Sequence, residues 1–445
     1  MTLPQITAEG GRFSELARKL LAAQPTIEHW LRGQWLEHAA PFYASVDLRN
    51  SGFKLAPVDT NLFPGGFNNL NSDFLPLCVQ AAMAALEKIC PDARGALIIP
   101  ENHTRNMFYL QNVAALRDIL RRAGMKVRIG TLIPEVTSPL VLPLSRGGEL
   151  TLEPLVRKGN RVGLNEFDPC VVLLNNDLSA GIPAILENLE QPVIPPLYAG
   201  WSTRLKSNHF AAYRQVAQEF GALLGLDPWL IDPYFGACGE INFQERQGEE
   251  CLATHVDMVL SQVRRKYQEY KIDLEPFVIV KADAGTYGMG IMSVKDPAEV
   301  RDLNRKQRNK MAVVKEGLQV TRVMVQEGVY TFESVNDAFA EPVIYLIDHF
   351  VVGGFYRVHT ARGRDESLNA PGMQFVPLAF EDACVLPEPE AIPESGPNRF
   401  YCYGIIARLA LLAASRELEQ AALAYETGAG EPGSAQPQPL KVARG

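Results

Sequence analysis

The 445-residue sequence lacks the cysteine patterns that stabilise small secreted domains. Its seven cysteines are scattered and odd in number, and no CxxC pair occurs among them. No pairing of a cysteine with a histidine is suggested either. A disulfide scaffold and a structural zinc site are therefore not expected, and this cysteine usage fits a reducing cytosol.

Long apolar runs and an excess of positive charge are also missing. No apolar run approaches the roughly 18 residues of a membrane span, and the N-terminus has no basic segment followed by an apolar core, so no signal peptide is expected. The net charge of −8 and the pI near 5.6 argue against a general nucleic-acid or anionic-membrane binder, although a local basic pocket stays open. We expect a cytoplasmic protein without nucleic-acid or membrane partners, and a homo-oligomer is possible.

The remaining composition is that of an ordinary globular protein, with 47% apolar and 21% charged residues. Apolar strands alternate with amphipathic helices, and polar residues follow the strands, which is the α/β pattern. Helices are expected at 13–32 (interrupted near Pro25), 74–90, 111–123, 253–270 and 400–424, and buried strands at 95–100, 126–129 and 170–174. The predicted organisation is an N-terminal part at 1–94 with an active-site loop at 46–71, an α/β substrate-binding domain at 95–235, nucleotide-binding lobes at 236–425 and a disordered tail at 426–445.

The most informative stretch is residues 277–292, where an apolar run ends in Lys281 and is followed by Asp283 and three glycines. This pattern is typical of a buried strand that enters a tight loop. Consecutive backbone N–H groups in such a loop bind anions, glycine permits close approach to a ligand, and a lysine adds positive charge. The stretch predicts a lid over a polyphosphate. The alternative is a glycine-rich hairpin with a solvated lysine.

Three further motifs fit a nucleotide and metal site. Residues 326–329 form a predicted hinge whose backbone would read adenine while Glu327 reaches ribose. Arg357 lies on a strand after paired glycines. The unit Asp59-Thr60-Asn61 offers hard oxygen donors of the kind that suit Mg²⁺. Each motif is weak alone, because an Asp-x-Asn unit is usually a turn or a cap.

Polar clusters at 101–106 and 175–181 follow two predicted strands. Ligands of open α/β sheets bind at the carboxyl ends of the strands, so both clusters are candidate substrate contacts. A turn followed by a helix cap explains each cluster equally well.

In combination these motifs resemble the ATP-grasp ligases, in the permuted order of eukaryotic glutathione synthetases. The segments VDLRNSGFKLAPVDTNLFPGGFNNL, LNNDLSAGIP and VIVKADAGTYGMGIM resemble signatures of the proteobacterial glutamate–cysteine ligase family of the Acidithiobacillus type, and this resemblance extends along essentially the whole chain. The chain departs from glutathione synthetases in having Asp59 in place of glutamate before the asparagine. Its lid motif is shorter, and the acid of that motif lies nearer the lysine.

The resemblance implies an α/β ATP-grasp enzyme that uses ATP and Mg²⁺ to join the γ-carboxylate of glutamate to cysteine through a γ-glutamyl phosphate. Alternatives are a glutathione synthetase or another ATP-grasp ligase, a non-catalytic nucleotide- or peptide-binding protein, and a small-molecule kinase. The implied metal ligands are Asp59, Asn61 and Asp283. The implied ATP contacts are Lys281, Gly285, Gly288, Gly290, Gln326, Glu327 and Val329, with Lys266 or Lys271 as a possible further contact.

The same resemblance implies catalytic roles for Arg49 and Arg357. The implied substrate contacts are Arg49, Asn50, Ser51, Lys54, Gly65, Gly66, Asn175, Asn176 and Asn369. Four of these residues also have structural alternatives: Arg49 in an ion pair with Asp47 or Asp59, Asn369 as a turn cap, and Asn175 and Asn176 as residues that stabilise a turn at the end of a strand.

Overall fold

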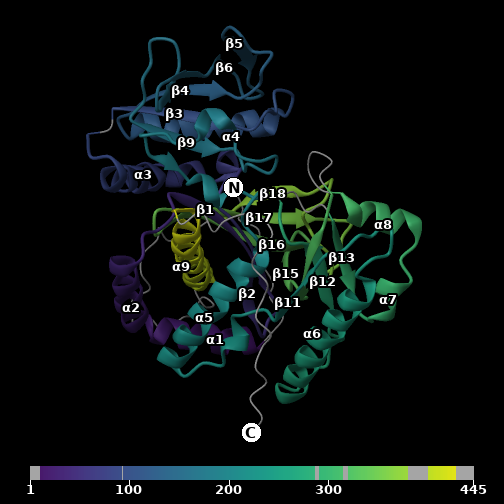
Figure 1. Cartoon of the computed structure of the whole chain (residues 1–445). Helices are drawn as coiled ribbons and strands as arrows, with labels where there is room; N and C mark the ends of the chain where they lie inside the picture. The colour runs from purple at the N-terminus through teal and green to yellow at the C-terminus, as the bar shows by residue number, and fades with distance from the viewer. Residues whose placement is uncertain (1–10, 93, 286–289, 314–318, 379–398, 427–445) are drawn as a thin grey trace.

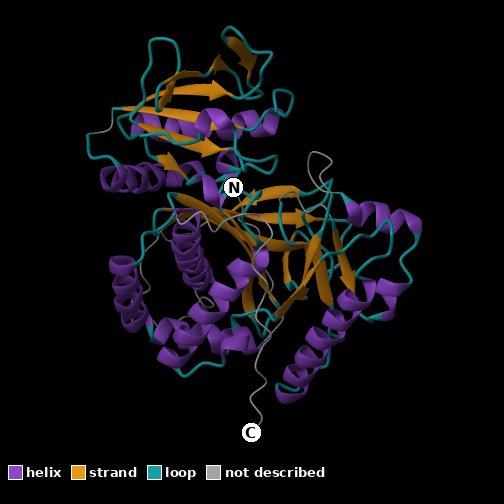
Figure 2. Ribbon diagram, viewed as in Figure 1, coloured by secondary structure: helices purple, strands orange, loops and turns teal. Residues whose placement is uncertain are grey.

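The computed structural model describes residues 11–92, 94–285, 290–313, 319–378 and 399–426, and its mixture of helices and strands confirms the predicted α/β class (Figures 1 and 2). The α-helices are α1 (Gly11–Ala22), α2 (Gln24–Glu37), α3 (Leu75–Ile89), α4 (Met107–Arg122), α5 (Lys206–Leu224), α6 (Glu249–Glu269), α7 (Ala298–Arg301), α8 (Arg305–Ala312) and α9 (Arg399–Glu426). The strands are β1 (Tyr43–Asn50), β2 (Leu55–Asn61), β3 (Gly95–Pro100), β4 (Lys126–Thr131), β5 (Leu140–Pro143), β6 (Glu149–Pro154), β7 (Val156–Lys158), β8 (Arg161–Gly163), β9 (Val171–Asn175), β10 (Val193–Ile194), β11 (Phe235–Gly239), β12 (Val278–Ala282), β13 (Ile291–Val294), β14 (Arg322–Glu327), β15 (Glu333–Val335), β16 (Ala338–Ile347), β17 (Phe350–His359) and β18 (Gln374–Pro377).

The central sheet joins the two ends of the chain. Its order is β18-β17-β16-β1-β2, with β15 also paired to β16, and all of these pairings are antiparallel. Val46 of β1 lies opposite Ile344 of β16. The predicted active-site loop at 46–71 is therefore wrong in its first half, which forms two strands. The segment was predicted as a loop because it is rich in polar residues. Several of these polar residues lie on the two strands and line a pocket.

The second sheet, at the top of Figure 1, has the order β10-β9-β3-β4-β6-β5 and is parallel from β10 to β6. Its inner strands β3 and β9 are fully buried, which explains why they appear in the sequence as unbroken apolar runs. Helices α3 and α4 share its apolar core. The helix and strand predictions for residues 74–129 and 170–174 are confirmed within a few residues, whereas the short strands β5 to β8 were not predicted.

The third sheet carries the predicted lid. Its order is β11-β14-β12-β13, and helix α6 packs on it through a shared apolar core (Figure 1). Strand β12 ends at Ala282, just after Lys281, so the predicted strand before the glycine loop is confirmed. The pairing of β12 with both β13 and β14 holds Lys281 opposite Ile291 and Met324.

A helical layer packs against the central sheet. Helix α9 is buried along most of its length and contacts α5, β1, β2 and α1. Helix α5 falls within the predicted 95–235 domain but packs on α9, where Arg204 and His209 bond to the buried carboxylate of Glu417. The predicted domain boundaries stay a prediction. Within the described ranges, no helix is both long and apolar enough to cross a membrane.

Candidate active site

A pocket of about 750 Å³, counting the solvent at its mouth, opens where β1 and β2, the start of α5, the lid sheet and strands β16 and β17 meet. Its lining contains both basic and acidic side chains. The lining residues are Asp47, Arg49, Val58, Asp59, Lys206, Ile279, Lys281, Ala282, Ala284, Gly285, Ile291, Gln326, Glu327, Val329, Glu341, Arg357, Ser367 and Asn369.

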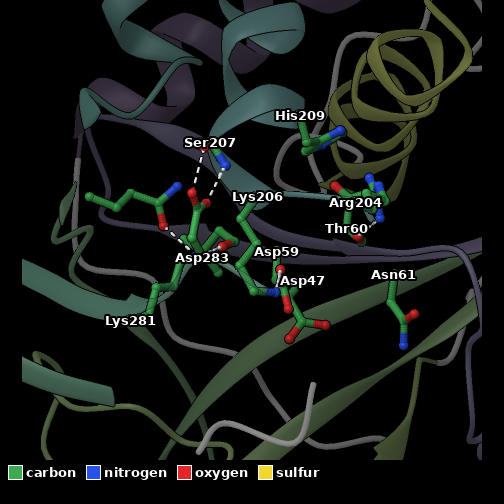
Figure 3. Close-up of polar contacts among 12 residues, drawn as sticks. Asp47, Asp59, Thr60, Asn61, Arg204, Lys206, Ser207, His209, Lys281 and Asp283 are labelled. Carbon is green, nitrogen blue, oxygen red and sulfur yellow. Dashed lines mark hydrogen bonds and ion pairs between the residues drawn. The ribbon is translucent and has the colours of Figure 1, made fainter. Parts of the chain in front are cut away.

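Asp59 contacts Lys206 (Figure 3) and is also influenced by the charge of Lys281. Its Oδ1 is 2.6 Å from Nζ of Lys206, and its side chain stays 34% exposed to the pocket. Lys281 donates to the backbone oxygen of Val58 at 2.6 Å and to Oε1 of Gln326 at 2.9 Å. Burial alone would raise the pKa of Asp59, but Lys206 and Lys281 together hold it well below its usual range. Burial lowers the pKa of Lys281 to about 8, although Asp59 opposes that shift.

A buried ion-pair network forms another part of the wall. Nη1 of Arg357 donates to Asp47 at 2.8 Å and to Glu341 at 2.6 Å. Nε of Arg49 donates to the other oxygen of Glu341 at 3.0 Å. Burial raises the pKa of Asp47 even though Arg357 opposes the shift, whereas the two arginines outweigh burial at Glu341 and lower its pKa. Arg49 thus pairs with an acid, as the structural alternative required, but its partner is Glu341.

Among the residues that the structure describes, two buried donors in the lining have no protein acceptor. They are Nε2 of Gln326 and Nε of Arg357. A buried donor without a partner costs about 1–3 kcal/mol, so such groups are commonly explained by a ligand or an ordered water. Each could donate to an oxygen that a ligand or an ordered water supplies.

Asp283 is not on the pocket wall, and the structure corrects its assignment as a metal ligand. It is fully buried, and its two carboxylate oxygens accept from the N–H and the hydroxyl of Ser207 at 2.8 and 2.7 Å (Figure 3). Its backbone oxygen accepts from the N–H of Lys206. An acid at a helix N-terminus satisfies free N–H groups and interacts well with the helix dipole. Asp283 therefore anchors the start of α5 and so positions Lys206.

Lys54, Asn50 and Ser51 are also structural, contrary to the prediction that they contact substrate. All three are fully buried. Nζ of Lys54 lies 2.8 Å from the carboxylate of Glu327, which also accepts from Trp229 and from the N–H of Tyr234. The ribose-binding role of Glu327 is thereby corrected, because its carboxylate is already occupied.

We expect Lys54→Met to lower the free energy of unfolding by about 3–5 kcal/mol, because it leaves a buried carboxylate without its cation. The double variant Lys54→Met/Glu327→Gln should recover part of that loss. Chemical denaturation of the two variants and the parent measures both effects. Unchanged stability together with a raised KM for a substrate would return Lys54 to the list of substrate contacts.

Four other predicted substrate residues lie outside the pocket lining. The carbonyl of Gly65 accepts from the hydroxyl of Tyr345, and Gly66 has a φ of +100°. Asn175 is buried and bonds to Tyr43 and to the carbonyl of Pro64. Asn176 bonds to the carbonyl of Pro100 and accepts from the N–H of Leu178, the turn-stabilising alternative considered above.

Asn61 likewise does not line the pocket. Its side chain accepts from the N–H of Phe63 at 2.9 Å and lies away from Asp59 (Figure 3). A metal role for Asn61 therefore has no support from this geometry and stays a prediction.

Some of the predicted nucleotide contacts lie together in the pocket lining. Lys281, Gly285, Gln326, Glu327 and Val329 line the pocket, and so do Arg49, Arg357 and Asn369 among the other predicted residues. Gly285 has a φ of +95° and Gly290 of +62°, the left-handed backbone that glycine adopts without strain. Gly290 is buried outside the lining, and Gly288 lies outside the described residues.

Four polar residues of the lining were not predicted as site residues from the sequence, namely Asp47, Lys206, Glu341 and Ser367. Asp47 was considered only as an ion-pair partner of Arg49. Lys206 belongs to no recognisable sequence motif. It reaches the pocket because α5 begins at this residue. Lys266, a suggested further ATP contact, pairs instead with Asp227 and Glu269, and neither Lys266 nor Lys271 lines the pocket.

Comparison with known proteins identifies the family. The family model for glutamate–cysteine ligase matches residues 17–418. A crystal structure of a protein from Methylobacillus flagellatus KT, assigned as a γ-glutamylcysteine synthetase, is 65% identical, with a TM-score of 0.87 over 94% of this chain and 99% of that chain. No match was found among curated protein sequences.

More distant solved structures resemble the chain only weakly. A glutathione synthetase-like effector from Globodera pallida is 11% identical over 78% of both chains, with a TM-score of 0.36. An ATP-grasp RimK domain protein from Sphaerobacter thermophilus is 11% identical over 72% of this chain and 98% of that chain, with a TM-score of 0.24. These likenesses are too low to carry an argument. The match over residues 17–418 and the 65% identity do carry one: the chain belongs to the glutamate–cysteine ligase family, and it is an ATP-dependent ligase.

Proposed function

We propose that the pocket binds ATP, Mg²⁺ and glutamate and that the enzyme ligates the γ-carboxylate of glutamate to the amino group of cysteine. The observation that carries this proposal is the presence of both charges in one pocket, in which Lys206, Lys281 and Arg357 lie together with Asp47 and Asp59. A polyphosphate and a carboxylate substrate need cations, whereas a divalent metal needs acids. Family membership supplies the identity of the two amino acids.

The donors in the pocket fit Mg²⁺. This ion prefers carboxylate oxygens, retains several waters and usually takes only one or two protein carboxylates together with substrate phosphates. Asp59 is the partly exposed acid at the centre of the pocket, and Asp47 is 17% exposed beside it. We propose that these two acids hold the metal, which when bound neutralises charge on the phosphates.

The basic side chains of the pocket would have different roles. Lys281 and Lys206 face the same space from opposite elements and would neutralise phosphate oxygens. The unpaired Nε of Arg357 would donate to the acyl phosphate or to its carbonyl oxygen. In the first step the γ-carboxylate displaces ADP from the γ-phosphorus, and in the second step the amine of cysteine displaces phosphate from the carbonyl carbon. Exclusion of water protects the acyl phosphate from hydrolysis.

The test uses purified protein with MgATP and one amino-acid pair at a time. We expect release of ADP and phosphate with glutamate plus cysteine, and a product with the mass of γ-glutamylcysteine. Turnover only with γ-glutamylcysteine plus glycine would favour a glutathione synthetase. ADP release with one substrate and no phosphate would indicate a kinase, and nucleotide binding without turnover a binding protein.

The pKa of Lys281 makes ATP binding sensitive to pH. Because burial lowers that pKa to about 8, the ammonium form is present below that pH and is lost as the pH rises through it. Binding of MgATP should therefore weaken by about tenfold one pH unit above that value. In Lys281→Arg, whose side chain stays charged, the affinity should vary little over the same range. Calorimetric titration of both proteins between neutral and alkaline pH measures this difference, and parallel pH profiles would contradict it.

The predicted cytoplasmic location and the possible homo-oligomer stay predictions.

A further inference from the structure

A cluster of reactive side chains lies on the lid sheet, outside the lining of the active-site pocket. Cys238 lies on β11, while Cys251 and His255 lie on α6, which packs along that strand (Figure 1). Their sulfur and ring-nitrogen atoms are within 4.8 Å of one another. The expectation that no cysteine pairs with a histidine is therefore wrong. Cys251 and His255 are one helical turn apart, and Cys238 reaches them only through the fold.

The distances favour a pair of thiols over a metal site. The two sulfur atoms are in direct contact at 2.7 Å, whereas two thiolates bound to one tetrahedral zinc, each at about 2.3 Å from the metal, lie about 3.8 Å apart. Nδ1 of His255 is 2.8 Å from the backbone oxygen of Cys251. That hydrogen bond needs a proton on Nδ1, so only Nε2 of this ring could bind a metal.

The two thiols differ in their readiness to react. Cys251 is exposed in the first turn of the 21-residue helix α6, so its sulfur is accessible to a small disulfide. Nδ1 of His255 also lies 3.6 Å from its sulfur. Cys238 is 2% exposed, and burial together with the neighbouring Cys251 raises the pKa of Cys238 to about 12. The exposed thiol is therefore placed to attack first.

We propose that Cys251 and Cys238 form a thiol–disulfide exchange site for low-molecular-weight aliphatic disulfides. The Cys251 thiolate attacks one sulfur of the small disulfide, forms a mixed disulfide and releases one thiolate, which takes up the proton that Cys251 lost. Cys238 then attacks Sγ of Cys251, its proton passes to the departing sulfur, and a second small thiol leaves. The small disulfide is reduced to two thiols as the two cysteines become one intramolecular disulfide.

The second step is favoured by the first. Burial is the largest cause of the high pKa of Cys238, and hydrogen bonding and charge from Cys251 add to it. Once Cys251 is part of a mixed disulfide, it carries neither its proton nor its charge. Because the contact between the sulfur atoms is already made, Cys238 needs little movement to reach its target.

The test uses the full-length protein, reduced with a phosphine and freed of it, and a neutral probe, 2-hydroxyethyl disulfide. Intact mass should fall by two hydrogen atoms with no adduct retained at this pair, and peptide mapping should link Cys238 to Cys251. A second sample receives zinc chloride alone and is dialysed. One tightly bound zinc per chain that is lost in Cys251→Ser would overturn the proposal in favour of a metal site.

Variants separate the two roles. Cys238→Ser should stop at a stable mixed disulfide on Cys251, and Cys251→Ser should leave Cys238 unmodified. His255→Ala should slow adduct formation several-fold. Cys90→Ser, which changes a partly exposed cysteine at the end of α3, is the matched control and should still form the link. A stable mixed disulfide on Cys251 in the parent protein, or no reaction there at all, would contradict the proposal.

Discussion

Asp59→Asn is expected to reduce kcat/KM for ATP by about 10²–10³-fold, because it removes the negative charge at the centre of the pocket while keeping the shape of the side chain. Asp59 is the acid that Lys206 and Lys281 both face, and it keeps a third of its side chain open to the pocket. When Asp59 loses its charge, Lys206 and Lys281 remain close together without this acid to neutralise them. The proposed metal also loses its main protein ligand. Steady-state kinetics at several Mg²⁺ concentrations measures the loss.

The control must separate lost chemistry from lost folding. Asp118→Asn changes an acid that is 53% exposed on α4 and pairs only with its neighbour Arg117, so it should leave kcat/KM unchanged. Asp59→Glu should recover part of the activity with a shifted dependence on Mg²⁺. Wild-type kinetics for Asp59→Asn would remove this residue from the metal site, and so would an activity loss that matches the loss of folded protein.

Arg357→Met should both abolish turnover and destabilise the protein by about 3–5 kcal/mol. The guanidinium of Arg357 joins the partly buried Asp47 to the buried Glu341. Its removal leaves Asp47 without a cation and Glu341 with Arg49 alone. Thermal and chemical denaturation measure the stability, and the assay with glutamate and cysteine measures turnover.

The stability loss should depend on pH in a defined direction. Burial already raises the pKa of Asp47 in the parent protein, and the loss of Arg357 removes the main opposing influence. An acid whose folded pKa is raised destabilises the fold above that pKa, and the penalty disappears below the unfolded value of about 3.9. The deficit of Arg357→Met should therefore shrink as the pH falls from neutral toward that value. A deficit that grows on acidification would show that the two acids are not the cause.

Arg357→Lys is the matched variant. It keeps the charge and should recover most of the stability. It should recover little turnover, because a lysine cannot supply the Nε donor that has no protein partner in the parent. Full activity in Arg357→Lys would reduce the role of this residue to ion pairing.

Much of the pocket could be predicted from local patterns. A strand that ends in a charged residue before glycines identifies Lys281. Asp59 was predicted from the Asp-x-Asn motif, and Arg357 from its position on a predicted strand after paired glycines. The buried parallel strands were predicted because the apolar run itself is the signal.

The residues that were missed or misassigned depend on contacts between distant segments. Lys206 matters because α5 begins there and Asp283 fixes that beginning. The spacing between Lys281 and Asp283 could not reveal that Ser207 would occupy the carboxylate. Lys54 looked like a pocket residue until the fold placed it against Glu327. Such pairings are set by tertiary packing, which no short window of sequence contains.

The position of β1 in the central sheet has a consequence for synthesis of the protein. One edge of β1 pairs with β2, and the other pairs with β16, where Val46 lies opposite Ile344. The edge that pairs with β16 has no partner until most of the chain has left the ribosome. At roughly 5–20 residues per second, the delay is on the order of tens of seconds. An unpaired strand edge is a template for pairing with other chains. Nascent chains of this ligase should therefore be more prone to aggregate than the finished enzyme, and their solubility should depend on holding chaperones until the last strands emerge.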